Sequence, residues 1–334
     1  MRRGQGTAAV SVRRSRDVPD LVAKAREGDP RAVARLVSLV EDGDEVLPQV
    51  AAALAPYAGD AHVIGLTGSP GVGKSTTTNE LVRAFRKQDR RVGVLAVDPS
   101  SPFTGGAILG DRVRMQDHAT DPGVYIRSMS SRGHLGGLSA ATPQAVRVLD
   151  GAGCDPVVVE TVGVGQAEVE IAGLADTTLV LLAPGMGDSI QAAKAGVLEI
   201  ADIFVVNKAD RDGADATYRD IQGMIGLGER APGQWRPRVL RSVAARGEGI
   251  EEIVAAITEH REHLHDTGEL RRRRERRAAA EIEAIALGTL RGRMEALRDG
   301  EVLAGLARRV ADGDLDPHSA AGELVTMTGL PNGR

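Results

Sequence analysis

The sequence predicts an α/β fold in which a mostly parallel β-sheet is flanked by helices. From His62 to about His260, short apolar segments alternate with longer segments that have the apolar spacing of helices. The apolar segments, such as Val157–Val159 and Thr178–Ala183, are continuous rather than alternating, which is typical of strands buried on both faces. Because sheets of this kind bind ligands at the carboxyl ends of their strands, functional residues are expected there.

The composition excludes several classes of protein. The chain has 334 residues, a formal net charge of −4 and a single cysteine, Cys154. A chain of this length can bury a large core, and its charge provides no field that would attract nucleic acid. One cysteine excludes an internal disulfide and fits a reducing, cytoplasmic location, and no apolar run is long enough to cross a membrane. We therefore expect neither nucleic acid nor a membrane as a partner.

Strands and helices of the central domain, residues 61–264, follow from these patterns. Strands are predicted at 62–67, 91–97, 156–160, 177–183, 202–206 and 237–241. Helices are predicted at 74–88, 139–151, 188–200, 215–227 and 249–264.

Helical segments precede and follow this domain. Residues 1–17 read as a disordered basic tail, and 18–60 as an N-terminal helical segment that packs against the core. Residues 265–334 form a C-terminal helical arm, with a long helix over Leu270–Leu297 and shorter helices near Glu301–Ala311 and Asp316–Met327. A long helix outside the sheet is typical of an oligomerisation arm.

The stretch Gly68–Ser75 fits the phosphate-loop pattern G-x-x-x-x-G-K-[ST] between a predicted strand and a predicted helix. Glycines let backbone N–H groups converge on an anion, and the helix N-terminus adds positive potential. Lys74 is expected to reach the β- and γ-phosphates, and Ser75 to bind Mg²⁺. The predicted phosphate-binding residues are Gly68, Ser69, Pro70, Gly71, Val72, Gly73, Lys74, Ser75 and Thr76.

Guanine recognition is predicted from Asn207-Lys-Ala-Asp210, which follows an apolar strand. The Asp210 carboxylate can accept both the ring N–H and the exocyclic amine of guanine, a bidentate match that adenine cannot supply. Asn207 and Lys208 are expected to brace the base and the phosphate loop. Ser242-Val243-Ala244 resembles a third base-contact element, with Val243 in a position that is usually alanine. The predicted ligand is GTP or GDP with Mg²⁺.

Catalytic and metal-binding residues are predicted around Glu160-Thr-Val-Gly163, which ends a strand. Glu160 is expected to hold Mg²⁺, and Gly163 to donate an N–H to the γ-phosphate. The residue after Gly163 is Val164 instead of a water-orienting glutamine, which predicts slow hydrolysis that a partner accelerates. Asp98 and Asp111 are further candidates for the Mg²⁺ shell, Asp111 as a switch carboxylate, although both also suit capping roles. The predicted catalytic residues are Lys74, Asp111, Glu160 and Gly163.

Two other groups of polar residues have less specific patterns. Asp188, Gln191 and Lys194 share one face of a predicted helix after a glycine-rich stretch and suit a switch loop, whereas capping by Asp188 fits equally well. His260 and His263 share a face near a helix end, where a solvated end is favoured over a metal site.

Together these segments resemble the methylmalonyl-CoA mutase-associated GTPases of the MeaB type, also labelled ArgK or LAO/AO transport kinases. The resemblance is carried by Val63–Ser75, Val97–Pro102, Ile108–Arg112, Arg132–Leu138, Glu160–Gln166 and Asn207–Asp210. It implies a P-loop GTPase that serves as a chaperone of an adenosylcobalamin-dependent acyl-CoA mutase. In such proteins GTP binding and hydrolysis gate loading of adenosylcobalamin, which the partner holds, and protect or reactivate the mutase.

The resemblance also implies a homodimer formed by the C-terminal helices and a third switch at Asp188, Gln191 and Lys194. The alternative function is an ATP-dependent protein kinase acting on a transport-linked periplasmic binding protein, against which Asn207 and Asp210 argue. A nickel-enzyme maturation GTPase would carry more histidine and cysteine than this chain has. A targeting GTPase of the signal-recognition class usually has threonine in place of Asn207 and aspartate in place of Glu160.

Overall fold

The computed structural model describes residues 17–98, 117–118, 120–130, 141–161, 167–185, 197–228, 231, 233–298 and 301–327. The chain divides into two compact units, residues 1–271 and 272–334, which are described separately.

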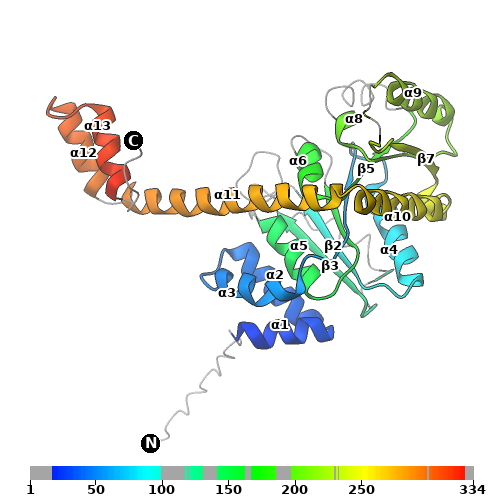
Figure 1. Cartoon of the computed structure of the whole chain (residues 1–334), viewed down its shortest axis with the longest axis horizontal. Helices are drawn as coiled ribbons and strands as arrows, with labels where there is room; N and C mark the ends of the chain where they lie inside the picture. The colour runs from blue at the N-terminus through cyan, green and yellow to red at the C-terminus, as the bar shows by residue number, and fades with distance from the viewer. Residues whose placement is uncertain are drawn as a thin grey trace, which may run out of the picture. The chain divides into compact units, whose positions relative to one another are not determined.

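A seven-stranded sheet forms the centre of the first unit (Figure 1). Its strand order is β3-β2-β4-β1-β5-β6-β7. Every pairing between neighbouring strands is parallel. The strands are β1 (Val63–Thr67), β2 (Val92–Asp98), β3 (Val124–Ser130), β4 (Val157–Thr161), β5 (Thr177–Leu182), β6 (Ile203–Asn207) and β7 (Arg238–Ser242). All residues of β1, β4, β5 and β6 are buried, as their continuous apolar sequences predict, and the α/β fold class is confirmed.

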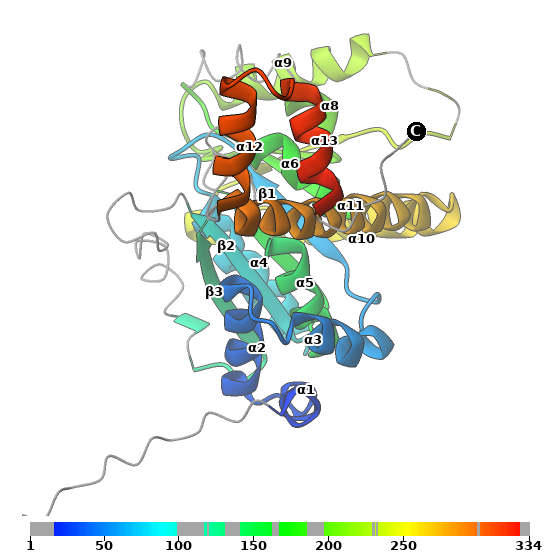
Figure 2. The ribbon, with the colours of Figure 1, turned by 90° about the vertical axis from the view of Figure 1, so that its left-hand side faces the viewer.

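Helices cover both faces of this sheet. On one face α4 (Lys74–Lys87) and α10 (Ile250–Asp266) share a core with β1 and β5, in which Phe85 and Leu181 are fully buried. On the other face α5 (Ala141–Gly151) packs with the N-terminal helices α1 (Val18–Glu27), α2 (Pro30–Asp42) and α3 (Leu47–Leu54), which lie together in Figure 2. The 3₁₀-helix η1 (Ala55–Tyr57) follows α3. The helix α9 (Ala214–Leu227) packs on β5 and β6.

The strand β3 and the helix α6 (Ala167–Leu174) were not predicted. β3 lies at the sheet edge and pairs with β2 along its whole length, from Val124 to Ser130. Its sequence interrupts the apolar pattern with Arg127, whose Nε donates to Glu41 Oε2 of α2 at 3.0 Å. A helix outside the sheet thus satisfies a charge that the strand pattern alone does not explain. Of the predicted helix at 188–200, the described part is α8 (Val197–Ile200).

The second unit contains most of α11 (Glu269–Arg298) together with α12 (Glu301–Ala311) and α13 (Pro317–Met327). These bounds agree with the predicted helices to within a few residues. Arg309 of α12 pairs with Glu323 of α13 at 2.7 Å. In the described part of the chain, every helix is too short or too polar to span a membrane.

Candidate functional site

Two glycines of the predicted phosphate loop have both a left-handed backbone and a close neighbour. Gly68 has φ 140°, and a Cβ there would lie 2.3 Å from the carbonyl oxygen of Leu181 in β5. Gly73 has φ 100°, and a Cβ there would lie 2.4 Å from Asn207 Nδ2. Both positions combine a left-handed backbone with a close approach to a neighbouring strand, so a side chain would displace the loop. The glycines of the motif therefore have a structural reason as well as a chemical one.

Lys74, the first residue of α4, turns back against this loop. Its side chain is buried, and Nζ donates to the carbonyl oxygens of Gly68 at 2.7 Å and Ser69 at 3.1 Å. The ammonium thus lies beside the N-terminus of α4, where the helix dipole adds further positive potential. This is the arrangement that a triphosphate requires, namely a cation and a helix N-terminus next to one glycine-rich turn. Pro70, Gly71 and Thr76 are exposed around it.

Ser75 and Glu160 lie in direct contact. Ser75 Oγ donates to Glu160 Oε1 at 2.7 Å, and Thr78 Oγ1 donates to Glu160 Oε2 at 2.8 Å. The carboxylate is buried near the carboxyl end of β4, and both of its oxygens are therefore used by α4. Thr78 was not predicted, although its spacing from Ser75 places the two on one helix face.

The pair of Ser75 and Glu160 fits Mg²⁺. The ion prefers hard oxygen ligands and is usually held by one or two protein groups together with substrate phosphates. A hydroxyl and a carboxylate 2.7 Å apart beside the phosphate loop supply such a donor set. Within the described ranges no three His, Cys, Asp or Glu side chains group as metal ligands, so an all-protein cage is absent there.

Asn207 connects the predicted base-reading segment to the phosphate loop. At the end of β6 its Nδ2 donates to the carbonyl oxygen of Val72 at 2.8 Å. Its Oδ1 accepts from Ser242 Oγ and from the backbone N–H of Ala244, each at 3.1 Å. One buried side chain therefore holds three segments that are distant in the sequence: the loop after β1, the end of β6 and the turn after β7.

Lys208 adds a second connection. Its backbone adopts a left-handed φ of 57°, which is uncommon for a residue with a side chain and concentrates at functional sites. This turn follows β6, and Lys208 Nζ donates to the carbonyl oxygen of Gly71 at 2.6 Å. The predicted bracing of the phosphate loop by both Asn207 and Lys208 is thus present as hydrogen bonds.

Asp210 lies beside the 3₁₀-helix η3 (Ala244–Arg246). Its Oδ2 accepts a hydrogen bond from Arg246 Nη2 at 2.8 Å, a contact that no sequence motif marks. Val243 donates its backbone N–H to the carbonyl oxygen of Glu248 at 3.0 Å, so this N–H is used within the chain.

The remaining predicted residues fall elsewhere. Asp98 ends β2 at the same edge of the sheet, and its side chain lies outside the described part of the chain. Asp111, Gly163, Asp188, Gln191 and Lys194, together with Val164, lie outside the described residues.

The histidine prediction was wrong for His260. Its side chain is fully buried in α10 instead of lying at a solvated end. Its Nδ1 lies 2.8 Å from Thr177 Oγ1, which in turn lies 2.7 Å from His62 Nε2. His260 Nε2 lies 3.3 Å from Asp202 Oδ1. These residues gather at the amino ends of the strands, opposite the phosphate loop, because His260 of α10 packs against the start of β5 and the residue before β6.

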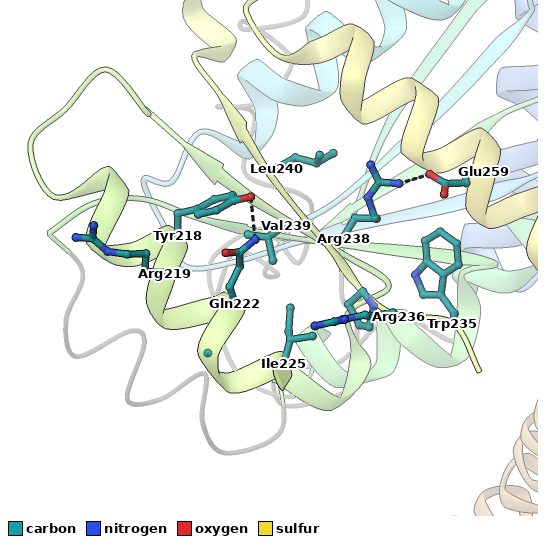
Figure 3. A pocket seen from close by; sticks show the side chains of 12 residues that line it. Tyr218, Arg219, Gln222, Ile225, Trp235, Arg236, Arg238, Val239, Leu240 and Glu259 are labelled. Carbon is teal, nitrogen blue, oxygen red and sulfur yellow. Dashed lines mark hydrogen bonds and ion pairs between the residues drawn. The ribbon is translucent and has the colours of Figure 1, made fainter. Parts of the chain in front are cut away.

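Cys154 and a surface hollow lie away from the phosphate loop. Burial raises the pKa of the Cys154 thiol to about 12, so the reactive thiolate does not form near neutral pH. A hollow of about 950 Å³ lies at the outer edge of β7, lined by α9 and α10 residues that include Tyr218, Gln222 and Glu259 (Figure 3). It contains none of the predicted site residues, so the candidate site is defined by the loop and not by this hollow.

Sequence relatives agree with the geometry. A family model for the methylmalonyl Co-A mutase-associated GTPase MeaB matches residues 33–299. A protein of Pyrococcus abyssi described as a GTPase is 49% identical over 312 residues, covering 92% of this chain and 96% of that protein. GTPase ArgK of Escherichia coli is 38% identical over 264 residues, covering 77% of this chain and 80% of its own length.

One further sequence relative and one crystal structure are also similar to this chain. The mitochondrial methylmalonic aciduria type A homolog of Caenorhabditis elegans is 38% identical over 216 residues, covering 64% of this chain and 54% of that protein. A crystal structure of a LAO/AO transport system kinase superimposes with a TM-score of 0.69 at 25% identity, covering 94% of this chain and 98% of that one. The family model and the Pyrococcus abyssi relative each match most of the chain. This chain belongs to the methylmalonyl Co-A mutase-associated GTPase family, MeaB.

Proposed function

We propose that the protein binds GTP through Gly68–Thr76 and reads guanine with Asp210. The observation that carries the proposal is the pair of hydrogen bonds from Asn207 and Lys208 to the carbonyl oxygens of Val72 and Gly71. They join the guanine-specific motif to the phosphate loop, as a single nucleotide that spans both would require. Ser75 and Glu160 would hold Mg²⁺, which would supply positive charge to the phosphates during hydrolysis.

Nucleotide affinity tests this assignment. Asp210→Asn replaces one acceptor oxygen by a donor, so affinity for GDP should fall about 10- to 100-fold, whereas affinity for ADP should change little. Isothermal titration of both nucleotides measures the difference. Equal affinity of the unmodified protein for GDP and ADP would refute guanine reading by this site.

The client is an adenosylcobalamin-dependent acyl-CoA mutase, in the first place methylmalonyl-CoA mutase. Support comes from the family description and from the name of the Caenorhabditis elegans relative. The GTP cycle of this chain gates loading of adenosylcobalamin, which the mutase carries, and protects or reactivates the mutase. Asp98, Asp111 and Gly163 complete the hydrolytic site, and Asp188, Gln191 and Lys194 form a third switch that senses the client.

Hydrolysis is slow in the free protein and faster in the complex. The sequence places Val164 where a water-orienting glutamine is usual, so a partner or a switch movement is needed to complete the site. GTP turnover should therefore rise by an order of magnitude or more when purified methylmalonyl-CoA mutase is added. An unchanged rate at saturating mutase, with binding of the two proteins verified, would contradict this proposal.

A protein-kinase function has one observation in its favour, the similarity to the crystal structure of a LAO/AO transport system kinase. It predicts ATP use and phosphoryl transfer to a transport-linked periplasmic binding protein. Incubation with labelled ATP or GTP separates the two functions, because a kinase labels a protein acceptor and a GTPase releases inorganic phosphate from GTP.

A homodimer is proposed on the second unit. On α11 the side chains of Ile282, Ile285 and Leu287 are 68%, 50% and 55% exposed. Exposed isoleucines separated by three residues on a long helix are typical of a helix–helix contact. Ile282→Glu with Ile285→Glu should convert a dimer to a monomer in sedimentation experiments, and Leu227→Glu, another exposed apolar position, serves as the matched control. A monomeric unmodified protein would contradict the proposal.

A further inference from the structure

Arg246, which belongs to none of the predicted nucleotide-binding motifs, contacts the carboxylate of Asp210 that is predicted to read guanine. Its Nη2 donates to Asp210 Oδ2 at 2.8 Å. A second carboxylate, that of Glu248, has its Oε1 3.6 Å from Arg246 Nη1. Of these two carboxylates, only that of Asp210 lies within hydrogen-bond distance of the guanidinium.

The turn that carries Arg246 is fixed to the other base-reading residue. The backbone N–H of Ala244 donates to Asn207 Oδ1 at 3.1 Å, and the backbone N–H of Arg246 donates to the carbonyl oxygen of Val243 at 2.8 Å. Asn207 ends β6 and Asp210 lies in the turn that follows it, and each is held by the same short turn after β7. Arg246 therefore extends from a position that is defined relative to the base-reading motif.

Such an arrangement matters for a bidentate contact. Both carboxylate oxygens must face the two N–H groups of guanine, and an aspartate that rotates freely loses affinity because it must be ordered on binding. A guanidinium on one oxygen restricts that rotation. Each carboxylate oxygen has more than one lone pair, so the contact with Arg246 leaves acceptor positions for guanine.

We propose that Arg246 is a positioning residue that holds the Asp210 carboxylate in the orientation that reads guanine. The inference rests on the proposed role of Asp210. It implies that Arg246 acts on guanine affinity only through Asp210 and not through the phosphates.

A double-mutant cycle on the full chain tests the proposal. Affinities for GDP and for IDP, which lacks the exocyclic amine, are measured for Arg246→Ala, Arg246→Lys, Asp210→Asn and the double variant Arg246→Ala with Asp210→Asn. Because the ion pair is partly exposed, Arg246→Ala should weaken GDP binding about two- to five-fold and IDP binding less. Arg246→Lys should restore part of the loss, and Arg246→Ala should have no further effect when Asp210 is already asparagine.

Arg83→Ala is the matched control. Arg83 has a similar exposure, and it pairs with Glu80 at 2.6 Å and with Asp117 at 3.4 Å instead of with Asp210, so its removal should leave the GDP to IDP affinity ratio unchanged. Unchanged or tighter GDP binding by Arg246→Ala would overturn the proposal. An equal loss of GDP affinity when Arg246→Ala is added to Asp210→Asn would also overturn it, because Arg246 would then attract the phosphates directly and not act through Asp210. Equal binding of GDP and ADP by the unmodified protein would instead refute the proposed function of Asp210 itself.

Discussion

Two clusters of polar side chains lie at opposite ends of the same sheet, and β1 connects them. At its carboxyl end the side chains of Lys74 and Asn207 donate to carbonyl oxygens of the phosphate loop. Ser75 donates to Glu160 of β4. Before its amino end His62 bonds to Thr177, which bonds to His260. Both clusters are buried and hydrogen-bonded, so burial and hydrogen bonding do not distinguish a ligand site from a structural network.

The difference lies in what the side chains bond to. At the carboxyl end they hold a glycine-rich turn at a helix N-terminus, where an anion can approach the backbone N–H groups. At the amino end His62, Thr177 and His260 bond to one another, and these bonds do not hold a glycine-rich turn. Changes at the carboxyl end should therefore alter ligand binding with little effect on stability, and changes at the amino end should do the reverse.

The largest effect is expected for Lys74→Ala. Removal of the ammonium that is proposed to contact the phosphates should lower GTP affinity about a thousandfold, since charge-assisted contacts to phosphate are among the strongest in proteins. The midpoint of thermal unfolding without nucleotide should change little. Lys87→Ala, at the exposed far end of α4, is the control for charge and should bind GTP normally. GTP affinity in Lys74→Ala that matches this control would refute the site.

A smaller effect, on stability alone, is expected from pH. Burial lowers the pKa of His62 from 6.5 to about 4, with a smaller opposing effect of Asp176. The unfolded chain therefore binds a proton more readily than the folded chain. The stabilisation is complete above pH 6.5 and is lost as pH falls from 6.5 to 4, by about 3 kcal/mol in the free energy of unfolding.

Comparison with His62→Gln isolates this proton from the carboxylates that also titrate in acid. Chemical denaturation at pH 7 and pH 4 should show a difference in pH dependence of about 3 kcal/mol between the two proteins. Parallel pH profiles would show that folding leaves the pKa of His62 unchanged. That result would contradict the assignment of a stabilising role to the cluster at the amino end.

The smallest effect is expected for Thr177→Val, which deletes the hydroxyl between His62 and His260. The two imidazoles lose a shared partner, so the free energy of unfolding should fall by about 1–2 kcal/mol. GTP affinity should be unchanged, because Thr177 lies at the opposite end of β5 from the phosphate loop. Thr258→Val, which deletes a hydroxyl bonded within α10, should cost less. A marked loss of GTP affinity in Thr177→Val would break the comparison.

The contiguous features were predictable from the sequence. The strands from β1 to β6 other than β3, the loop Gly68–Ser75 and the segment Asn207–Asp210 are encoded by neighbouring residues with strict backbone or burial requirements. A fully apolar strand fits only a covered sheet, and Gly68 and Gly73 adopt backbone conformations that other residues avoid. β3 was missed because its Arg127 is satisfied by Glu41 of α2, a contact that no local pattern contains.

The sequence by itself determined the α/β class and predicted the phosphate loop and the guanine-reading motif, since each depends on residues within a short stretch. Only the tertiary structure decided that Thr78 joins Ser75 on Glu160, that Arg246 meets Asp210, and that His260 is buried. In each case the partners come from segments that are distant in the sequence, and they meet because parallel strands align their ends on the same side of the sheet. Which side chains meet at the ends of the strands is therefore set by the fold and not by any one segment.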